Sequence, residues 1–351
     1  MARADNELRG RGWRAALRRR GGAAADDGPE PGADEDARED PEPEVEIEEE
    51  TGVGAAGGRP APAATFAPPL LAGADGPARQ ILERADQDPG PLELPGVLAI
   101  ANQKGGVGKT TTAVNLGSAL AELGYRVLVV DLDPQGNATT GLGVNPRDLE
   151  SSLYDVIMHD APIEDCVEPT SLKNLFVAPA TIDLAGAEIE LVPAMSRELK
   201  LRKAIDAIRP DYDLVLIDCP PSLGLLTVNG LAAADDVVVP IQCEYYALEG
   251  LGQLLRNVGL VRSNLNPGLD VRGIVLTMYN ARTRLADQVA AEVRAHFGPK
   301  VYATVVPRTV RLSEAPSFGQ PIIVFDSNSR GAKAYRDLAK EVSRGATRRS
   351  G

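Results

Sequence analysis

A short glycine-rich segment holds the residues best suited to chemistry. Residues 104–111 read KGGVGKTT. Glycines at this spacing let backbone N–H groups approach a phosphate, and a helix starting after the loop adds the positive end of its dipole. In such a loop Lys109 meets the β- and γ-phosphates and Thr110 holds Mg²⁺. The pattern therefore predicts a phosphate cradle, not a plain strand-to-helix turn. Its nucleotide-binding residues are Lys104, Gly105, Gly106, Val107, Gly108, Lys109, Thr110 and Thr111.

The loop also departs from the general G-x-x-x-x-G-K-[ST] pattern. Gln103 stands where that pattern has its first glycine, and Lys104 beside it supplies a second lysine. A carboxylate, Asp218, ends the apolar run 214–217. A buried carboxylate is costly unless a ligand uses it, which favours a metal role over a cap at a strand end.

Elements of two kinds alternate from residue 97 onward and must position these groups. Apolar runs of strand length occupy 97–101, 127–130, 214–217, 237–241 and 273–277. Helical stretches occupy 110–123, 248–261, 286–297 and 334–342. Continuous Val/Ile/Leu strands separated by helices are typical of a parallel sheet buried on both faces. We therefore predict one doubly wound, mostly parallel α/β domain over 95–351, which binds ligands at the carboxyl ends of its strands.

The chain before this domain differs in composition. Residues 1–94 hold 21 acidic and 11 basic residues, a net charge of −10 within the chain's −13. Large apolar residues are scarce in 21–75, so little burial is available to offset backbone entropy. We predict a disordered acidic N-terminal extension over 1–94. Its Arg-rich start, 1–20, is either a solvated tail or a segment that becomes helical against a partner or an anionic surface.

Charge and cysteine content bound the class of protein. The body carries only −3, so the overall acidity does not exclude a local basic face for DNA. Three cysteines, Cys166, Cys219 and Cys243, lack the spacing of a zinc site or a disulfide framework. No apolar run reaches the length of a membrane span, and the first residues do not read as a signal peptide. We predict a cytoplasmic protein that does not bind a membrane.

Four further sequence segments resemble the motifs of one protein family. They are 130–139 (VDLDPQGNAT), 217–224 (IDCPPSLG), 242–250 (QCEYYALEG) and 307–317 (PRTVRLSEAPS). With the loop at 104–111, they resemble the ParA/Soj branch of the deviant Walker ParA/MinD superfamily of P-loop NTPases. The resemblance covers residues 97 to about 342 and leaves the N-terminal extension outside.

The resemblance implies roles for individual residues. Asp218 matches the Walker B carboxylate that holds Mg²⁺ through water, and Asp133 matches the one that positions the attacking water. Lys104 matches a lysine that reaches the phosphates of the partner in an ATP-bound homodimer. These matches make Lys104, Lys109 and Asp133 the predicted catalytic residues. For Asp131 we favour a structural or switch role.

The resemblance also implies partners. Arg282 and Arg311 match positions that bind DNA without sequence preference, although arginines on a solvated face or in salt bridges remain the alternative. Asn280 follows the strand 273–277, where related ATPases present an amide to adenine, but a turn residue is nearly as good a reading. The implied function is a partitioning switch. An ATP-bound dimer holds nucleoid DNA, and hydrolysis stimulated by a ParB-type centromere-binding protein releases it.

Three other functions fit less well. A MinD-like membrane cycle needs a C-terminal amphipathic helix, and residues 341–351 offer no apolar face. A metal-cluster carrier resembling the nitrogenase iron protein needs paired cysteines, which Cys219 and Cys243 do not supply. A noncatalytic DNA-binding scaffold could dispense with Asp133, which is present.

Overall fold

The structure is a computed structural model and describes residues 90–94, 96–244 and 247–344. The predicted disorder of 1–94 concerns residues that lie almost wholly outside this range, so it stays a prediction. Leu92, just before the predicted domain start, is buried in a core of the body.

One eight-stranded sheet organises the described chain, in the order β3-β4-β2-β5-β1-β6-β7-β8. Every strand pair is parallel except β3 with β4. The strands are β1 (Gly96–Ile100), β2 (Val127–Asp131), β3 (Glu168–Pro169), β4 (Leu175–Ala178), β5 (Leu214–Asp218), β6 (Asp236–Gln242), β7 (Asp270–Tyr279) and β8 (Val301–Pro307). The predicted doubly wound, mostly parallel sheet is confirmed.

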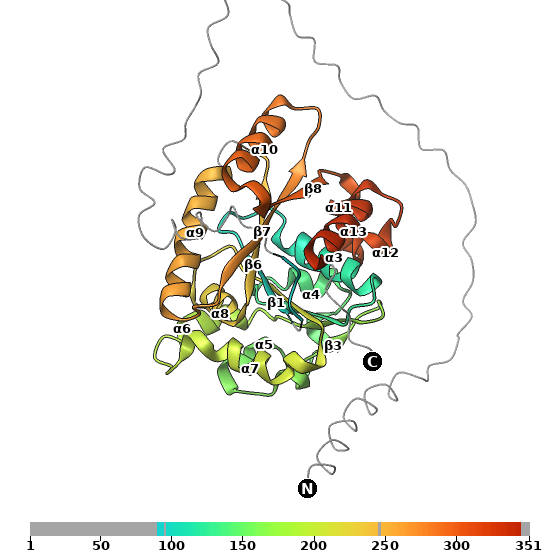
Figure 1. The fold of residues 1–351 in the computed structure, drawn as a ribbon. Helices are drawn as coiled ribbons and strands as arrows, with labels where there is room; N and C mark the ends of the chain where they lie inside the picture. The colour runs from blue at the N-terminus through green and yellow to red at the C-terminus, as the bar shows by residue number, and fades with distance from the viewer. Residues whose placement is uncertain (1–89, 95, 245–246, 345–351) are drawn as a thin grey trace, which may run out of the picture. The chain divides into compact units, whose positions relative to one another are not determined.

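Helices connect the strands and cover both faces of the sheet (Figure 1). They are α3 (Lys109–Glu122), α4 (Asn137–Gly141), α5 (Leu153–His159), α6 (Leu184–Glu190), α7 (Lys200–Ile208), α8 (Leu225–Ala233), α9 (Ala247–Asn264), α10 (Arg284–Phe297), α11 (Val310–Glu314), α12 (Ile322–Phe325) and α13 (Arg330–Ser343). Short 3₁₀ helices include η8 (Ala315–Phe318). In Figure 1 the helices α3, α11, α12 and α13 lie on one side of the strands, and α6, α8 and α9 lie on the other.

Alternation along each strand divides the interior into two cores. In β1, Val97 and Ala99 join a core shared with α5 to α10, whereas Leu98 and Ile100 join a core shared with α3 and α13. All five residues of β1, β2 and β5 are buried, as expected for central strands covered on both faces. These buried strands form a rigid base under the loops at their carboxyl ends.

The parallel direction brings distant segments to one edge of the sheet. The glycine-rich loop follows β1, Asp131 ends β2 and Asp218 ends β5. Asp218 of β5 lies opposite Asp131 of β2 on one side and opposite Ile100 of β1 on the other. Residues more than 80 positions apart in sequence thereby meet at one site.

Candidate nucleotide site

Left-handed glycines shape the loop after β1. Gly106 and Gly108 adopt φ angles of 74° and 85°, a region that side chains with a Cβ rarely enter. Helix α3 begins directly afterwards at Lys109. The Thr277 hydroxyl of β7 donates a 2.8 Å hydrogen bond to the Val107 carbonyl, so the loop is held to a strand that lies beyond β6 in the sheet. This is the strand–loop–helix context that the phosphate cradle requires.

Lys109 is a buried cation inside this loop. Its side chain is 6% exposed, and its ammonium donates to the Lys104 carbonyl at 3.3 Å. Burial lowers its pKa, while the nearby Asp218 and Asp133 oppose that shift. The lysine ammonium and the start of α3 suit an anion such as a nucleotide phosphate, whereas the two carboxylates near the lysine suit a cation.

Asp218 is the most unusual polar group of the site. It is fully buried, and neither carboxylate oxygen has a hydrogen-bond partner among the described residues. Burial raises its pKa well above the ordinary value; the Asp131 carboxylate adds to this, and the nearby Thr110 side chain opposes it. A buried carboxylate without partners is expensive unless a cation uses it. Asp218 and Thr110 therefore fit Mg²⁺, which accepts hard oxygen ligands.

Asp133 lies at the start of the loop that follows β2. It is 8% exposed, and its Oδ1 accepts from the Gln135 backbone N–H at 3.0 Å. The preceding carboxylate, Asp131, is fully buried, and burial raises its pKa to about 6 despite hydrogen bonds from Thr139 and Asp133. The structure therefore gathers the predicted residues Lys109, Asp133 and Asp218 at one edge of the sheet.

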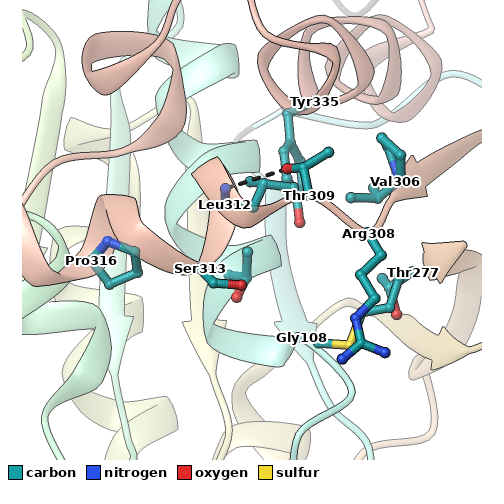
Figure 2. A pocket seen from close by; sticks show the side chains of 12 residues that line it. Gly108, Thr277, Val306, Arg308, Thr309, Leu312, Ser313, Pro316 and Tyr335 are labelled. Carbon is teal, nitrogen blue, oxygen red and sulfur yellow. Dashed lines mark hydrogen bonds between the residues drawn. The ribbon is translucent and has the colours of Figure 1, made fainter. Parts of the chain in front are cut away.

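A cavity of about 250 Å³ adjoins the loop. Its lining residues are Gly108, Thr111, Thr277, Met278, Val306, Pro307, Arg308, Thr309, Leu312, Ser313, Pro316 and Tyr335. Figure 2 shows the Arg308 side chain pointing toward Gly108 and Thr277. The cavity thus continues from the phosphate loop to the carboxyl ends of β7 and β8, which is where a base and ribose could extend.

Asn280 does not line this cavity. It is exposed, and its side-chain oxygen accepts from the Arg282 backbone N–H at 3.1 Å. That bond gives it a turn-forming role, and its contact with adenine stays a prediction. The residues that the sequence reasoning missed are Thr277, Met278 and Arg308. Their positions could have indicated them, because Thr277 ends a predicted strand, Met278 follows it, and Arg308 is the second residue of the segment 307–317.

Lys104 points away from the buried site. Its ammonium pairs with Glu244 at 2.9 Å, and both side chains are substantially exposed, at 38% and 48%. Its backbone N–H is held by the Asn102 side chain at 3.1 Å. The loop is therefore anchored while the lysine side chain remains accessible from outside.

The two predicted DNA-binding arginines are both exposed. Arg282 follows β7, and Arg311 lies in α11 after β8. The Arg308 backbone N–H donates to the Tyr279 carbonyl at 3.0 Å and joins these two segments. Arg311 contacts Glu314 at 3.2 Å and Asp326 at 3.7 Å, so it already has acidic neighbours.

The buried cysteines concern the metal-cluster alternative, and the helices concern the membrane alternative. Cys219 and Cys243 are buried free thiols, and no group of three or more potential metal-binding side chains occurs among the described residues. In the described part of the chain, no helix has the length and apolar content needed to cross a bilayer. Helix α13 turns its apolar residues toward the core shared with α3.

Comparison with known proteins places this site in a family. A family model described as an AAA domain matches residues 96–271. The chain is 60% identical over 247 residues to the sporulation initiation inhibitor protein Soj of Bacillus subtilis, covering 70% of this chain and 98% of that protein. It is 58% identical over 248 residues to the chromosome partitioning protein ParA of Caulobacter vibrioides, covering 70% and 93%.

A solved structure is also similar. It is that of cobyrinic acid a,c-diamide synthase from Mycobacterium smegmatis with bound ADP and magnesium. It matches with a TM-score of 0.63 and 43% identity, over 71% of this chain and 94% of that one. The match to a structure that holds ADP and magnesium agrees with ATP and Mg²⁺ as the cofactors. The deviant loop, the buried carboxylates and the identities of 58–60% lead to one conclusion: this chain is an ATPase that belongs to the ParA/Soj family of chromosome-partitioning proteins.

Proposed function

We propose that this ATPase is a switch for partitioning a chromosome or plasmid. The ATP-bound homodimer binds DNA without sequence preference, and hydrolysis stimulated by a ParB-type partner releases it. On this proposal the protein is cytoplasmic and associates with the nucleoid. The observation that carries the proposal is the position of Arg282 and Arg311, exposed on segments joined at the same sheet edge as the nucleotide loop.

This arrangement suits a nonspecific DNA contact. Binding of phosphates depends on basic side chains sharing a surface and on release of counterions, and it needs no base-reading element. The acidic partners of Arg311 are partly exposed, at 43% for Glu314 and 35% for Asp326. Exposed ion pairs are worth only about 0–1 kcal/mol, so a DNA phosphate can compete for the guanidinium.

Hydrolysis would use the buried residues in separate roles. Lys109 and the loop N–H groups bind and orient the phosphates, and Asp133 orients the attacking water. Mg²⁺, when held by Thr110 and Asp218, neutralises charge on the phosphates. Most of the catalysis in phosphoryl transfer is orientation and charge neutralisation, which these groups provide.

Lys104 would act across the dimer. Its outward position and its exposed pairing with Glu244 leave it free to exchange one anion for another. A lysine that reaches the partner's phosphates makes the dimer a requirement for turnover. Dimerisation also brings two copies of Arg282 and Arg311 to one DNA, which makes DNA binding depend on ATP.

A salt series on DNA affinity tests the proposal. We expect Arg282→Glu and Arg311→Glu to abolish ATP-dependent DNA binding, with ATP-dependent dimerisation intact. The variants Arg282→Ala and Arg311→Ala should bind DNA more weakly. The plot of log affinity against log salt should also become less steep, by about 0.9 for each DNA phosphate that the protein no longer neutralises. Arg202→Glu is the matched control, because Arg202 is an exposed arginine of α7 on the other side of the sheet. If both Glu variants held DNA as tightly as the parent, this surface would be wrong.

A second experiment tests the roles in hydrolysis. Lys109→Ala should abolish ATP binding, because it removes the charge that binds phosphate. Asp133→Ala should bind ATP normally and stop turnover, because only the orientation of water is lost. Equal loss of ATP binding in both variants would remove Asp133 from its proposed role.

A further inference from the structure

One buried threonine connects the loop that carries Asp133 to the rest of the fold. Thr139, in α4, is fully buried. Its backbone N–H and its hydroxyl both donate to Asp131 Oδ2, each at 2.7 Å. The same hydroxyl accepts from the Ala180 backbone N–H at 3.0 Å, in the segment between β4 and α6. The hydroxyl therefore uses its own donor and also satisfies a buried backbone donor.

Asp131 holds the other end of the same loop. Its Oδ1 accepts from the Asp133 backbone N–H at 3.3 Å. One carboxylate therefore binds both the start and the end of the segment Asp133–Thr139. The turn between them is closed by the Gly136 backbone N–H, which donates to the Asp133 carbonyl at 2.9 Å.

This network fixes Asp133 against the sheet and not only within its own turn. Asp131 lies opposite Asp218 in the β2–β5 register, and the Leu132 backbone N–H donates to the Asp218 carbonyl at 3.0 Å. Through Ala180, Thr139 adds a second attachment at the end of β4. Fully satisfied buried networks rigidify the groups they hold, whereas an apolar core would supply packing without this orientation.

We propose that Thr139 is a positioning residue for ATP hydrolysis. Its hydroxyl holds Asp131 and the β4–α6 segment in one arrangement, and that arrangement sets where the Asp133 carboxylate stands relative to the bound nucleotide. The proposal rests on the role given above to Asp133. A misplacement of about 1 Å in a catalytic group costs about 100-fold in rate, so small shifts of this loop have large consequences.

Substitutions of matched shape separate positioning from packing. Thr139→Val keeps the shape, removes the hydroxyl donor to Asp131 and leaves the Ala180 N–H buried without its acceptor. Thr139→Ser keeps the hydroxyl and loses a methyl group. Thr140→Val is the control, because the Thr140 hydroxyl donates within its own helix turn to the Gly136 carbonyl at 3.1 Å.

The experiment measures kcat, KM and ATP affinity on the full chain with Mg²⁺. We expect Thr139→Val to lower kcat by about 10- to 100-fold, the usual range for a residue that orients a functional group through hydrogen bonds. KM and the Kd for an unhydrolysable ATP analogue should stay within about threefold, because the phosphate loop is untouched. Thr139→Ser and Thr140→Val should keep kcat near the parent value.

Three results would overturn the proposal. The first is a Thr139→Val protein with normal kcat and only a lower Tm. The second is a Thr139→Ser protein as slow as Thr139→Val, and the third is a raised KM with unchanged kcat. If Thr139→Val does not fold, Thr139→Cys takes its place. Because a thiol is a weaker donor than a hydroxyl, the kcat of Thr139→Cys should be lower than that of Thr139→Ser, and an equal kcat would overturn the proposal.

Asp133→Asn separates this proposal from the one on which it rests. If Asp133→Asn hydrolyses ATP normally, the role of Asp133 is wrong and Thr139 has no catalytic group to position. If Asp133→Asn is inactive and Thr139→Val is normal, only the inference about Thr139 fails. We expect the double variant to be no slower than Asp133→Asn alone, because residues that act as a unit are not additive.

Discussion

Asp218 at one edge of the sheet and the cations Arg272 and Lys300 at the other edge are satisfied in different ways. At the carboxyl edge, Asp218 is fully buried and neither oxygen has a partner among the described residues. At the amino edge of β6 and β7, two buried cations pair with half-buried carboxylates, although Asp270 Oδ1 has no hydrogen-bond partner among the described residues. Arg272 approaches Asp236 at 3.7 Å, and Lys300 contacts Asp270 at 3.1 Å.

The amino edge also uses its cations to hold the segment before β1 and the end of α13. Arg272 donates to the Gly90 carbonyl at 2.9 Å and to the Val342 carbonyl at 3.4 Å. Lys300 donates to the Val271 carbonyl at 2.6 Å. These bonds join the segment before β1, the end of α13 and the start of β7, so the cluster contributes to stability.

The difference indicates which buried charges serve a ligand. A buried charge that the protein itself satisfies contributes to the fold, and removing its partner is destabilising. A buried charge left without partners destabilises the protein alone and becomes favourable only with a ligand. Substitutions at Arg272 and at Asp218 should therefore change stability in opposite directions.

The largest expected effect is at the amino edge. Arg272→Met leaves the half-buried Asp236 carboxylate without its paired cation and removes two bonds to backbone carbonyls. We expect the free energy of unfolding to fall by about 3–5 kcal/mol, as measured by urea denaturation. Lys109→Met, at the carboxyl edge, serves as the control and should change stability far less while abolishing ATP binding. A similar loss of stability in both variants would break the distinction between the edges.

The next effect is a dependence of stability on pH. Burial raises the pKa of Asp236 to about 6, with Arg272 opposing, and burial raises that of Asp131 to about 6. A carboxyl whose pKa is higher in the folded state than in the unfolded state binds more protons when folded. Stability therefore falls as pH rises from about 4 to about 6, by at most about 3 kcal/mol for each group.

Urea denaturation at pH 5.0, 6.0 and 7.5, without nucleotide, measures this dependence. We expect the free energy of unfolding to be highest at pH 5.0, and Asp236→Asn to flatten the slope. Carboxylates with lowered pKa, such as Glu122 and Asp160, lose their contribution only at lower pH. Stability that rises steadily from pH 5.0 to 7.5 would contradict the shifts at both edges.

Sequence reasoning performed unequally on these two edges. The carboxyl edge was predictable because Lys109, Asp133 and Asp218 lie in continuous words next to apolar strands. The amino-edge cluster was not, because Arg272 and Lys300 look like ordinary surface charges until the register brings them together.

The same limit explains part of what was missed in the fold and the site. Strands β3, β4 and β8 were not predicted. β3 has only two residues, β8 contains exposed and half-buried positions, and β4 is an apolar run as long as 127–130 that was overlooked. Thr277 and Arg308 line the same cavity because β7 lies beside β8. The pairing of these two strands cannot be predicted from a local sequence pattern. Thr139 reads as a plain helix residue until its bonds to Asp131 and Ala180 are known.

A smaller effect, of opposite sign, is expected at Asp218. Asp218→Asn replaces a buried carboxyl group whose ionised form has no partner among the described residues, so the nucleotide-free protein should be at least as stable as the parent, with the largest gain above the raised pKa of the carboxyl. With saturating Mg²⁺ and ATP the order should reverse, because a ligand at 100 times its Kd stabilises the parent by about 2.7 kcal/mol. Thermal unfolding with and without Mg-ATP measures both. A nucleotide-free Asp218→Asn protein that is less stable than the parent would place Asp218 with the structural charges.

The smallest effect on stability is expected at Lys104, where the charge is neither buried nor structural. Its pair with Glu244 is exposed, and such pairs are worth about 0–1 kcal/mol, so Lys104→Ala should leave Tm almost unchanged. If Lys104 reaches the partner's phosphates, the same variant should lose ATP-dependent dimerisation in size-exclusion chromatography with light scattering. Glu244→Gln is the matched control, because it removes the ion pair and keeps the lysine, so it should dimerise like the parent. If Lys104→Ala dimerises and hydrolyses ATP normally, the lysine does not act in trans. If Glu244→Gln fails in the same way as Lys104→Ala, the ion pair itself shapes the loop.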